Sequence, residues 1–384
     1  MRTLPGGVAW RGSLHDLYDA NLRLRAASRV LVRVARFEAR AFSQLERRAR
    51  AIDWSAFLAP GAAVRLNVTC RRSKLYHQRA VAERVLDAIE RAGGAVRGKA
   101  VDGVTHADAP RRGGRARTAS PKRAAAAARD EDGGDVDDAS QLFIVRFDRD
   151  RCTISADASG ALLHRRGYRV DVAKAPLRET LAAAMLLVVD WPASAPLFDP
   201  MCGSGTIPIE AALLARRIPP GLAASPRRRY AFEAWPGHEP GLLDAIIEKA
   251  AGEALPAAPA PITGADRDAG AVAAASANAD RAGVGGDVVF ERNALSAAEP
   301  RGEAGWLVTN PPYGGRVGER EPLRDLYAAL GNRVRRRLPR WSVALLSADR
   351  RLEAQTSLAF DEVMRTRNGG IPVRLVVARP PHEA

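Results

Sequence analysis

Residues 197–206, LFDPMCGSGT, combine an acid, two glycines and the start of an apolar helix. Asp199 and Pro200 close a short apolar run, which predicts the end of a buried strand. Gly203 and Gly205 carry no Cβ, so the backbone there can turn sharply and approach a ligand. The run TIPIEAALLARR that follows predicts a helix whose first N–H groups and positive dipole end face that ligand. The stretch therefore predicts a nucleotide-type cofactor site at the carboxyl edge of a parallel sheet.

Elimination narrows the choice of cofactor. A dinucleotide fingerprint needs a third glycine where this chain has Pro208, and an acid about 20 residues further on, whereas the best acid, Asp266, lies much farther away. A P-loop needs a Gly-Lys-Ser/Thr ending, which is absent here. S-adenosyl-L-methionine has an amino-acid end and no phosphate, so it suits an acid that precedes a G-x-G turn. A glycine loop in some other α/β protein is the alternative from this stretch alone.

A second stretch, residues 306–313 (WLVTNPPY), is another apolar run that ends in a polar and aromatic motif. Its two prolines stiffen the backbone between an amide and a ring. At the end of a strand beside a cofactor turn, this motif predicts a rigid floor, whereas on its own it could simply stop a strand. The pair of stretches resembles class I S-adenosylmethionine-dependent methyltransferases that act on exocyclic amino nitrogens of bases.

The groups of the second motif indicate a mechanism for such a transfer. The side-chain oxygen of Asn310 and the carbonyl of Pro311 can accept both hydrogens of an exocyclic amine. This orients the amine lone pair toward the methyl carbon and stabilises the positive charge that develops on nitrogen. Pro312 keeps the floor rigid, and Tyr313 can stack on a base that has left its helix. The scheme requires no metal ion, so we expect no metal site.

Length and composition indicate the number of domains, the class of partner and the cellular compartment. A chain of 384 residues exceeds what one core normally holds, which predicts two domains. The net charge of +15 favours a polyanionic partner such as nucleic acid, although an arginine-rich proteome would give the same excess. Cys70, Cys152 and Cys202 have no metal-ligand spacing and fit a reducing compartment, so we expect a cytoplasmic protein. The start, MRTLPGGVAWRG, is no signal peptide, and no apolar run is long enough for a membrane span.

The first half alternates helical and strand patterns from about residue 13 to residue 94. Residues 73–85, SKLYHQRAVAERV, together with the strands around them, resemble the later part of a THUMP domain, an RNA-binding module. The family module usually begins with a further strand and helix, so we expect either a truncated start or an abbreviated module here. From about residue 106 to residue 139, a basic block, an alanine run and an acidic block predict a disordered insert.

Two segments join the halves, residues 159–169 and residues 174–191. Both resemble the corresponding join in the bacterial 23S ribosomal RNA guanine-N2-methyltransferases with a THUMP domain. That resemblance implies that Arg178 and Thr180 help to line the cofactor pocket. His164 lies beside two arginines, and we expect it to face solvent or RNA.

The second half continues the α/β pattern. The strand pattern of residues 261–266 ends in Asp266, which is placed to accept hydrogen bonds from the ribose hydroxyls of the cofactor. Asn293 and Ala294 lie where the adenine edge would be. The last two strand patterns form a hairpin around Asn368, and we expect a seven-stranded sheet with one antiparallel strand at its end. The predicted cofactor-binding residues are Arg178, Thr180, Asp199, Pro200, Cys202, Gly203, Ser204, Gly205, Asp266, Asn293, Ala294 and Asn310, and the predicted catalytic residues are Asn310, Pro311, Pro312 and Tyr313.

The predicted fold class is α/β. A smaller α/β, THUMP-like, RNA-binding domain (residues 1–172) precedes a Rossmann-like seven-stranded methyltransferase domain (residues 173–384). The resemblance implies methyl transfer to the N2 amine of a guanine in RNA, with ribosomal RNA favoured. A transfer RNA guanine-N2-methyltransferase shares both motifs and stays an alternative. The THUMP-like half argues against a DNA adenine or protein glutamine methyltransferase. The intact glycine turn and Asn310 argue against the remaining alternative, a non-catalytic RNA-binding protein.

Overall fold

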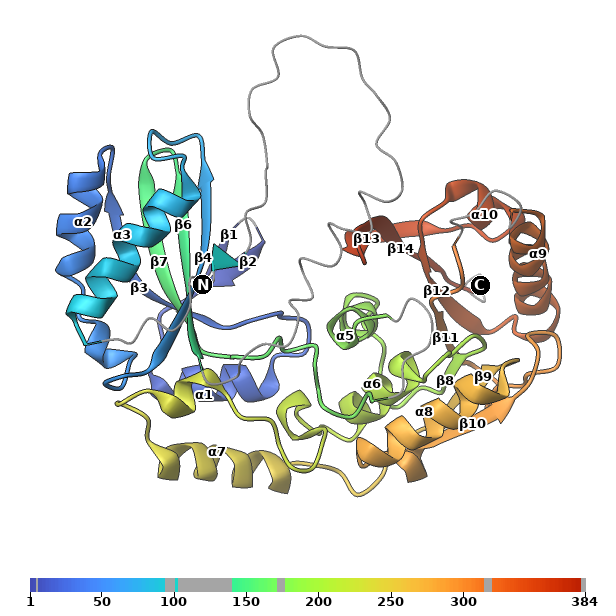
Figure 1. The fold of residues 1–384 in the computed structure, drawn as a ribbon. Coiled ribbons are helices and arrows are strands. Elements are labelled where there is room, and N and C mark those ends of the chain that lie inside the picture. The colour runs from blue at the N-terminus through green and yellow to red at the C-terminus, as the bar shows by residue number, and fades with distance from the viewer. Residues whose placement is uncertain (5, 94–100, 103–139, 171–176, 314–319, 381–384) are drawn as a thin grey trace, which may run out of the picture. The chain divides into compact units, whose positions relative to one another are not determined.

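A computed structural model describes residues 1–4, 6–93, 101–102, 140–170, 177–313 and 320–380 (Figure 1). The predicted insert at residues 106–139 lies outside the described residues. The chain forms two compact units, each built from three separate stretches of the sequence. The first contains residues 1–21, 29–163 and 229–246, and the second contains residues 22–28, 164–228 and 247–384. A functional boundary at residue 172 stays a prediction.

The described strands of the first unit form a five-stranded sheet in the order β3-β7-β6-β4-β5, beside a short hairpin of β1 and β2. The strands are β1 (Arg2–Leu4), β2 (Gly7–Ala9), β3 (Leu31–Glu38), β4 (Ala63–Arg71), β5 (Val101–Asp102), β6 (Ser140–Asp148) and β7 (Arg151–Asp157). The helices are α1 (Leu14–Arg23), α2 (Phe42–Arg50) and α3 (Gln78–Arg91). Val81, Val85 and Ile89 of α3 are buried.

Residues 229–246 return to the first unit through aromatic side chains. The ring of Phe232 stacks on Tyr18 with their centroids 4.3 Å apart. Trp235 Nε1 donates a hydrogen bond to Gln141 Oε1 at 2.7 Å. These contacts anchor the stretch in the first unit. Helix α7 (Pro240–Gly252), which follows them, was not predicted.

The described strands of the second unit form one seven-stranded sheet in the order β10-β9-β8-β11-β12-β14-β13. The strands are β8 (Leu197–Asp199), β9 (Ile262–Asp266), β10 (Val288–Arg292), β11 (Gly305–Thr309), β12 (Trp341–Ser347), β13 (Asp361–Asn368) and β14 (Ile371–Ala378). Of these seven, β14 is antiparallel to both of its neighbours. The five strands β10, β9, β8, β11 and β12 are mutually parallel. The predicted antiparallel strand is confirmed, but it lies one position inside the edge, because β14 inserts between β12 and β13.

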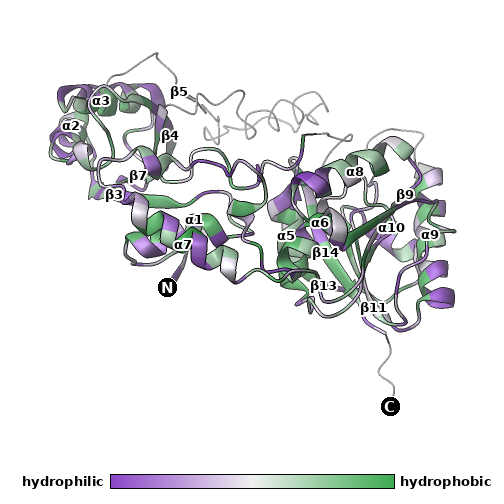
Figure 2. Ribbon diagram, turned by 90° about the horizontal axis from the view of Figure 1, so that it is seen from below, coloured by the Kyte–Doolittle hydropathy of each residue, from purple (hydrophilic) through white to green (hydrophobic). Residues whose placement is uncertain are grey.

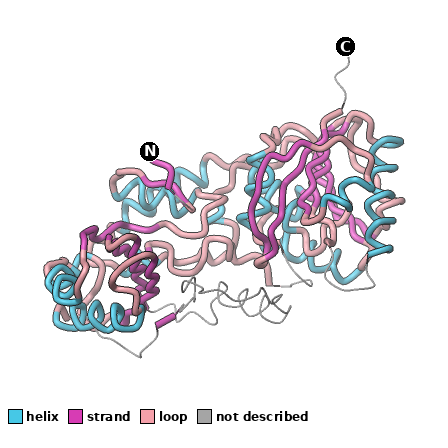
Figure 3. The backbone as a smooth tube through the Cα atoms, turned by 90° about the horizontal axis from the view of Figure 1, so that it is seen from above, coloured by secondary structure: helices cyan, strands magenta, loops and turns pink. Residues whose placement is uncertain are grey.

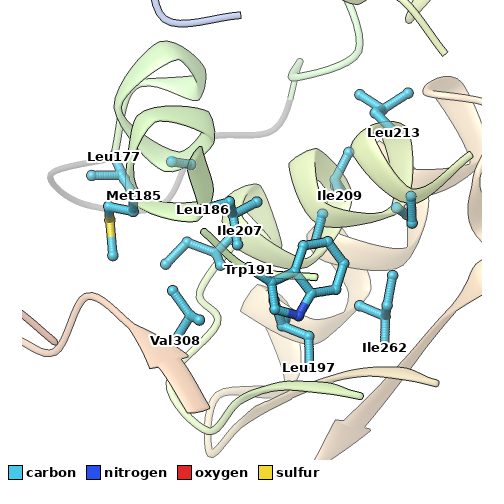
Figure 4. Close-up of a cluster of buried hydrophobic side chains, with 14 of the residues drawn as sticks. Leu177, Met185, Leu186, Trp191, Leu197, Ile207, Ile209, Leu213, Ile262 and Val308 are labelled. Atoms are coloured by element: carbon cyan, nitrogen blue, oxygen red, sulfur yellow. The ribbon is translucent and has the colours of Figure 1, made fainter. Parts of the chain in front are cut away.

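Helices cover both faces of this sheet (Figure 3). They are α5 (Glu179–Val188), α6 (Thr206–Ala215), α8 (Ala269–Arg281), α9 (Arg320–Arg337) and α10 (Arg350–Gln355). Side chains alternate between the faces of a strand. Accordingly, Val308 of β11 packs with α5 and α6, whereas Leu307 packs with α9 and α10. Figure 4 shows Leu197, Ile262 and Val308 on the strands that face α5 and α6, with Trp191 beside Leu197. Figure 2 shows hydrophilic residues on part of α9.

A charged cluster is buried inside the second unit. Arg166 Nε lies 3.3 Å from Glu210 Oε1 of α6, and both side chains are almost fully buried. Arg25 Nη2 donates hydrogen bonds to the carbonyls of Leu213 at 3.2 Å and Ile218 at 2.7 Å. A short stretch near the N-terminus therefore satisfies carbonyls at the C-terminal end of α6.

This cluster corrects one expectation. His164 was expected to face solvent or RNA, but it is 5% exposed. The neighbouring Arg166 is buried as well, because its guanidinium pairs with Glu210 rather than with solvent. In addition, Tyr168 Oη donates to Glu210 Oε1 at 3.1 Å, so the whole segment is held against α6.

Candidate active site

Three predicted site residues end or follow neighbouring parallel strands. Asp266 ends β9, Asp199 ends β8 and Asn310 follows β11. The chain leaves β8 toward β9 on one side, and β11 lies on the other side of β8. In an open parallel sheet, such a switch point leaves a crevice outside the carboxyl ends of the strands, where ligands bind. The structure therefore brings the acids and the amide to the predicted edge.

The glycine turn between β8 and α6 bends sharply, as its sequence predicted. Gly203 has φ +53° and Gly205 has φ +82°, values that L side chains rarely adopt. A Cβ on Gly205 would lie 2.9 Å from side-chain carbons of Ala275 and Phe290, whereas a Cβ on Gly203 would meet no atom within 4 Å. Gly205 is thus required for packing, and Gly203 leaves open space above the turn.

Asn278 of α8 supports this turn, a role that its sequence context does not predict. Its side chain is fully buried, and Nδ2 donates a hydrogen bond to the carbonyl of Ser204 at 3.1 Å. An asparagine in an alanine-rich helix does not by itself indicate such a role. The turn is also joined to β9, because the N–H of Cys202 donates to the carbonyl of Ala265 at 2.9 Å.

The carboxylate of Asp266 is half-buried and linked to the turn. Oδ2 accepts the N–H of Gly203 at 3.0 Å, and Oδ1 accepts the N–H of Asp268 at 2.9 Å. A carboxylate oxygen has capacity for more than one hydrogen bond, so each oxygen keeps acceptor capacity for a ligand. Two neighbouring hydroxyls of a ribose match this pair of acceptors.

Asp199 lies beneath the turn and is fully buried. Burial raises the pKa of its carboxyl to about 7, and the N–H of Met201, which Oδ1 accepts at 3.1 Å, opposes that shift. The nearby charge of Asp266 raises the pKa further. The charged form of Asp199 is therefore disfavoured unless a cationic group comes close.

The remaining predicted cofactor-binding residues differ in their burial and in their contacts with the turn. Pro200, Cys202 and Ser204 are buried within the turn. Asn293 is half-buried and donates its N–H to the carbonyl of Asp266 at 3.0 Å, which links the ends of β9 and β10. Ala294 is exposed. Arg178 is the N-cap residue of α5 and Thr180 is buried in its first turn, and their role toward a cofactor stays a prediction.

The Asn-Pro-Pro-Tyr motif leaves one polar atom open. Asn310 Oδ1 is buried and accepts no hydrogen bond from any described residue. Pro311 is buried and Pro312 is exposed. Tyr313 packs partly against the apolar core, and its Oη accepts a hydrogen bond from Asn368 Nδ2 at 2.7 Å. The sequence predicts a hairpin at Asn368 but not this contact.

These observations fit S-adenosyl-L-methionine as the predicted cofactor. The open space above Gly203 would receive its amino-acid end near the start of α6, and Asp266 offers acceptors for a ribose. A cationic ligand close to the buried carboxyl of Asp199 would stabilise its charged form.

In the part of the chain that the structure describes, no three or more His, Cys, Asp or Glu side chains gather as metal ligands would. None of the helices in these ranges has both the length and the apolar character needed to cross a bilayer.

Comparison with known families agrees with the geometry. Residues 166–376 match the family described as RMKL-like, methyltransferase domain, and residues 1–31 match the RlmL ferredoxin-like domain. The family match contains the glycine turn, Asp266, Asn310 and Asn368.

Similar proteins match nearly all of this chain. A ribosomal RNA large subunit methyltransferase K/L from Syntrophotalea carbinolica is 35% identical over 96% of this chain and 48% of its own length. A putative RNA methyltransferase from Synechocystis is 30% identical, covering 96% of this chain and 88% of its own. A crystal structure titled as a putative methyltransferase complexed with SAH has a TM-score of 0.76 and 25% identity, covering 97% of this chain and 89% of its own. The chain spans about half the length of the ribosomal RNA methyltransferases that it matches.

Proposed function

Because this chain belongs to the family of RMKL-like methyltransferases, we propose that it transfers a methyl group from S-adenosyl-L-methionine to the exocyclic N2 amine of a guanine in RNA. The favoured substrate is 23S ribosomal RNA, since relatives that align with nearly the whole chain carry the name of a ribosomal RNA large subunit methyltransferase. An enzyme that acts on ribosomal RNA works in the cytoplasm, the location expected from the cysteine content.

The observation that carries this proposal is the open acceptor of Asn310. A buried oxygen without a donor costs about 1–3 kcal/mol, so it needs a reason to be there. An exocyclic amine has two N–H groups, and Asn310 Oδ1 together with the Pro311 carbonyl would accept them. The two acceptors hold the amine lone pair in one direction and stabilise the positive charge that grows on nitrogen.

The glycine turn holds the cofactor in this scheme. S-adenosyl-L-methionine supplies an activated methyl carbon on its sulfonium. Asp266 accepts the ribose hydroxyls, while its own hydrogen bond from Gly203 keeps the turn and the acceptor pair in one arrangement. Asn278 fixes the Ser204 carbonyl from behind, so the turn needs little reorganisation when the cofactor binds.

A loop of the first unit supports RNA as the substrate class. Tyr76 is 65% exposed and lies against the ring of His77 with centroids 4.1 Å apart. Leu75 is buried beside it, and the N–H of Lys74 donates to Asp150 Oδ1 at 2.7 Å, so the exposed ring stands on a fixed loop. The side chains of Arg72 and Lys74 form no ion pair among the described residues. An exposed aromatic ring flanked by exposed cations suits an unpaired base and its phosphates.

The experiment uses unmodified transcripts of 23S ribosomal RNA and of transfer RNA, with methyl-labelled S-adenosyl-L-methionine. Digestion to nucleosides and mass spectrometry identify the product. We expect N2-methylguanosine from ribosomal RNA. Label on the N6 amine of adenine, or on transfer RNA alone, would overturn the assignment of base or of substrate.

A binding measurement tests the loop separately. Tyr76→Ala should weaken RNA affinity by about 1–3 kcal/mol, whereas Tyr76→Phe should keep it, because stacking needs the ring and not the hydroxyl. Trp10→Ala removes another exposed aromatic ring of the same unit and serves as the control. Equal affinities for all three variants would remove Tyr76 from the RNA contact.

A further inference from the structure

The hairpin of β13 and β14 reaches the same edge of the sheet as the candidate site. Because β14 is antiparallel to both β12 and β13, strand β13 runs parallel to β12 and ends at the carboxyl edge. Its last residue, Asn368, pairs with Ile371 across Gly369 and Gly370, which have φ +53° and +83°. Such a two-residue turn fixes the position of the residue before it.

Asn368 differs from its neighbours on this edge strand. Residues 363, 365 and 367 are exposed, whereas Met364, Thr366 and Asn368 are half-buried, as the alternation of a strand requires. Asn368 Nδ2 uses its inward position to donate a 2.7 Å hydrogen bond to Tyr313 Oη, a residue 55 positions earlier. The contact therefore joins the hairpin to the end of the Asn-Pro-Pro-Tyr motif.

This bond complements the other constraints on Tyr313. The ring packs partly against the apolar core, and two prolines restrict the backbone before it. Core packing restrains the Tyr313 ring but does not determine which group forms a hydrogen bond with its hydroxyl. The amide of Asn368 defines where that hydroxyl lies, and with it the rotation of the ring.

We infer that Asn368 is a positioning residue, which fixes the Tyr313 ring so that the acceptor base meets a preformed wall beside Asn310. This inference rests on the proposed function, since it assumes that the motif receives the base. Asn368 itself contacts neither the cofactor nor the reacting amine; it acts through Tyr313.

The test is a double-mutant cycle with Asn368→Ala, Tyr313→Phe and the pair together. The rate of single-turnover methyl transfer to ribosomal RNA should fall about tenfold in Asn368→Ala. A tenfold change corresponds to about 1.4 kcal/mol, the contribution of one hydrogen bond. The double variant should be no slower than Tyr313→Phe, because both changes remove the same bond. Asn368→Asp should recover most of the rate, since its carboxylate can accept the tyrosine O–H. Cofactor affinity by calorimetry should stay unchanged throughout.

Thr366→Ala is the matched control, because it lies two residues earlier on the same inward row. We expect it to methylate at the wild-type rate. Losses that add in the double variant, or a wild-type rate for Asn368→Ala beside a slow Tyr313→Phe, would show that Asn368 only shapes the turn.

A second readout separates this inference from the proposed function. With 3-fluorotyrosine incorporated, the ¹⁹F resonance of Tyr313 should shift and broaden in Asn368→Ala but not in Thr366→Ala. If the wild-type protein methylates no RNA, the proposed function fails, and this resonance alone decides the positioning role. A Tyr313 resonance that is unchanged in Asn368→Ala would overturn it.

Discussion

The cofactor half and the acceptor half of the site differ in how their polar groups are satisfied. In the cofactor half, Asp266 accepts two backbone N–H groups and the Ser204 carbonyl accepts the amide of Asn278. In the acceptor half, Asn310 Oδ1 has no donor among the described residues, although the hydroxyl of Tyr313 is held by Asn368.

This difference indicates where each half gets its shape. Internal hydrogen bonds maintain the cofactor turn without a ligand. The binding energy of the cofactor is therefore not needed to order the site. The acceptor half keeps one buried oxygen unmatched among the described residues, and in the proposed reaction an amine would satisfy it. A change in the first half should therefore alter stability or cofactor affinity, and a change in the second should alter rate.

The acceptor half should give the largest effect. Asn310→Ala should slow single-turnover methyl transfer about a hundredfold to a thousandfold, by analogy with the loss of an oxyanion-hole donor. Affinities for cofactor and RNA should remain at the wild-type level, and Asn310→Asp should retain part of the rate because a carboxylate also accepts both hydrogens. A wild-type rate in the alanine variant would make the motif structural and remove the contrast between the halves.

The two glycines of the turn sharpen the comparison within the cofactor half. Gly205→Ala should lower the free energy of unfolding by about 2–4 kcal/mol, since a left-handed backbone and an overpacked Cβ both cost energy. Gly203→Ala is the matched control: it should lose about 1 kcal/mol of stability but bind S-adenosyl-L-methionine less tightly, because its Cβ enters the open space. Urea unfolding without cofactor and calorimetry with it measure the two effects. Equal unfolding midpoints for the two variants would contradict the packing argument.

Asp266 tests the predicted contact with the ribose. Asp266→Ala should weaken cofactor binding by about 1.5–3 kcal/mol, or roughly tenfold to a hundredfold, because acceptors on a charged group are lost. Asp266→Asn should fall between the wild type and the alanine variant, since it keeps one acceptor oxygen. Calorimetry on the folded variants decides, and unchanged affinity in Asp266→Ala would reject the role.

The buried carboxyl of Asp199 predicts a dependence on pH. Its pKa is raised to about 7 in the folded protein, so between about pH 4 and pH 7 the folded state holds a proton that the unfolded chain has released. Wild-type stability should therefore fall relative to Asp199→Asn as the pH rises through this range, by at most about 1.4 kcal/mol per pH unit. Urea unfolding of both proteins across this pH range gives the difference in their free energies of unfolding. Titrating groups that both proteins share contribute equally and cancel in this difference. A difference that grows in the opposite direction would mean that the charged carboxylate is stabilised.

Local sequence signals predicted the parts of the site that depend on neighbouring residues. The glycine turn and the Asn-Pro-Pro-Tyr motif are short stretches whose residue types dictate backbone shape, and the structure has both at the expected strand ends. The support from Asn278 and Asn368 could not be predicted, because each side chain acts on a residue more than 50 positions away. A single asparagine in a helix or a turn has the same local pattern whether or not it has such a partner.

The buried position of Arg166 went unpredicted for the same reason. Its sequence context, two arginines beside a histidine, is typical of a solvated surface. Its burial depends on Glu210, which lies 44 residues later in the middle of an apolar helix. The position of β14 inside the sheet edge also depends on pairing between distant strands, which a list of strand patterns does not contain.

The interleaved units limit how this protein could be shuffled or shortened as a gene. Residues 22–28 lie between two chain segments of the first unit, yet they belong to the unit that carries the site. A fragment of residues 173–384 would lose both Arg25, which binds the end of α6, and Arg166, the partner of the buried Glu210. An acid left alone in that position costs about 3–5 kcal/mol. Recombination at the predicted boundary would thus produce an unstable module, so the two halves of the gene are constrained to be inherited together.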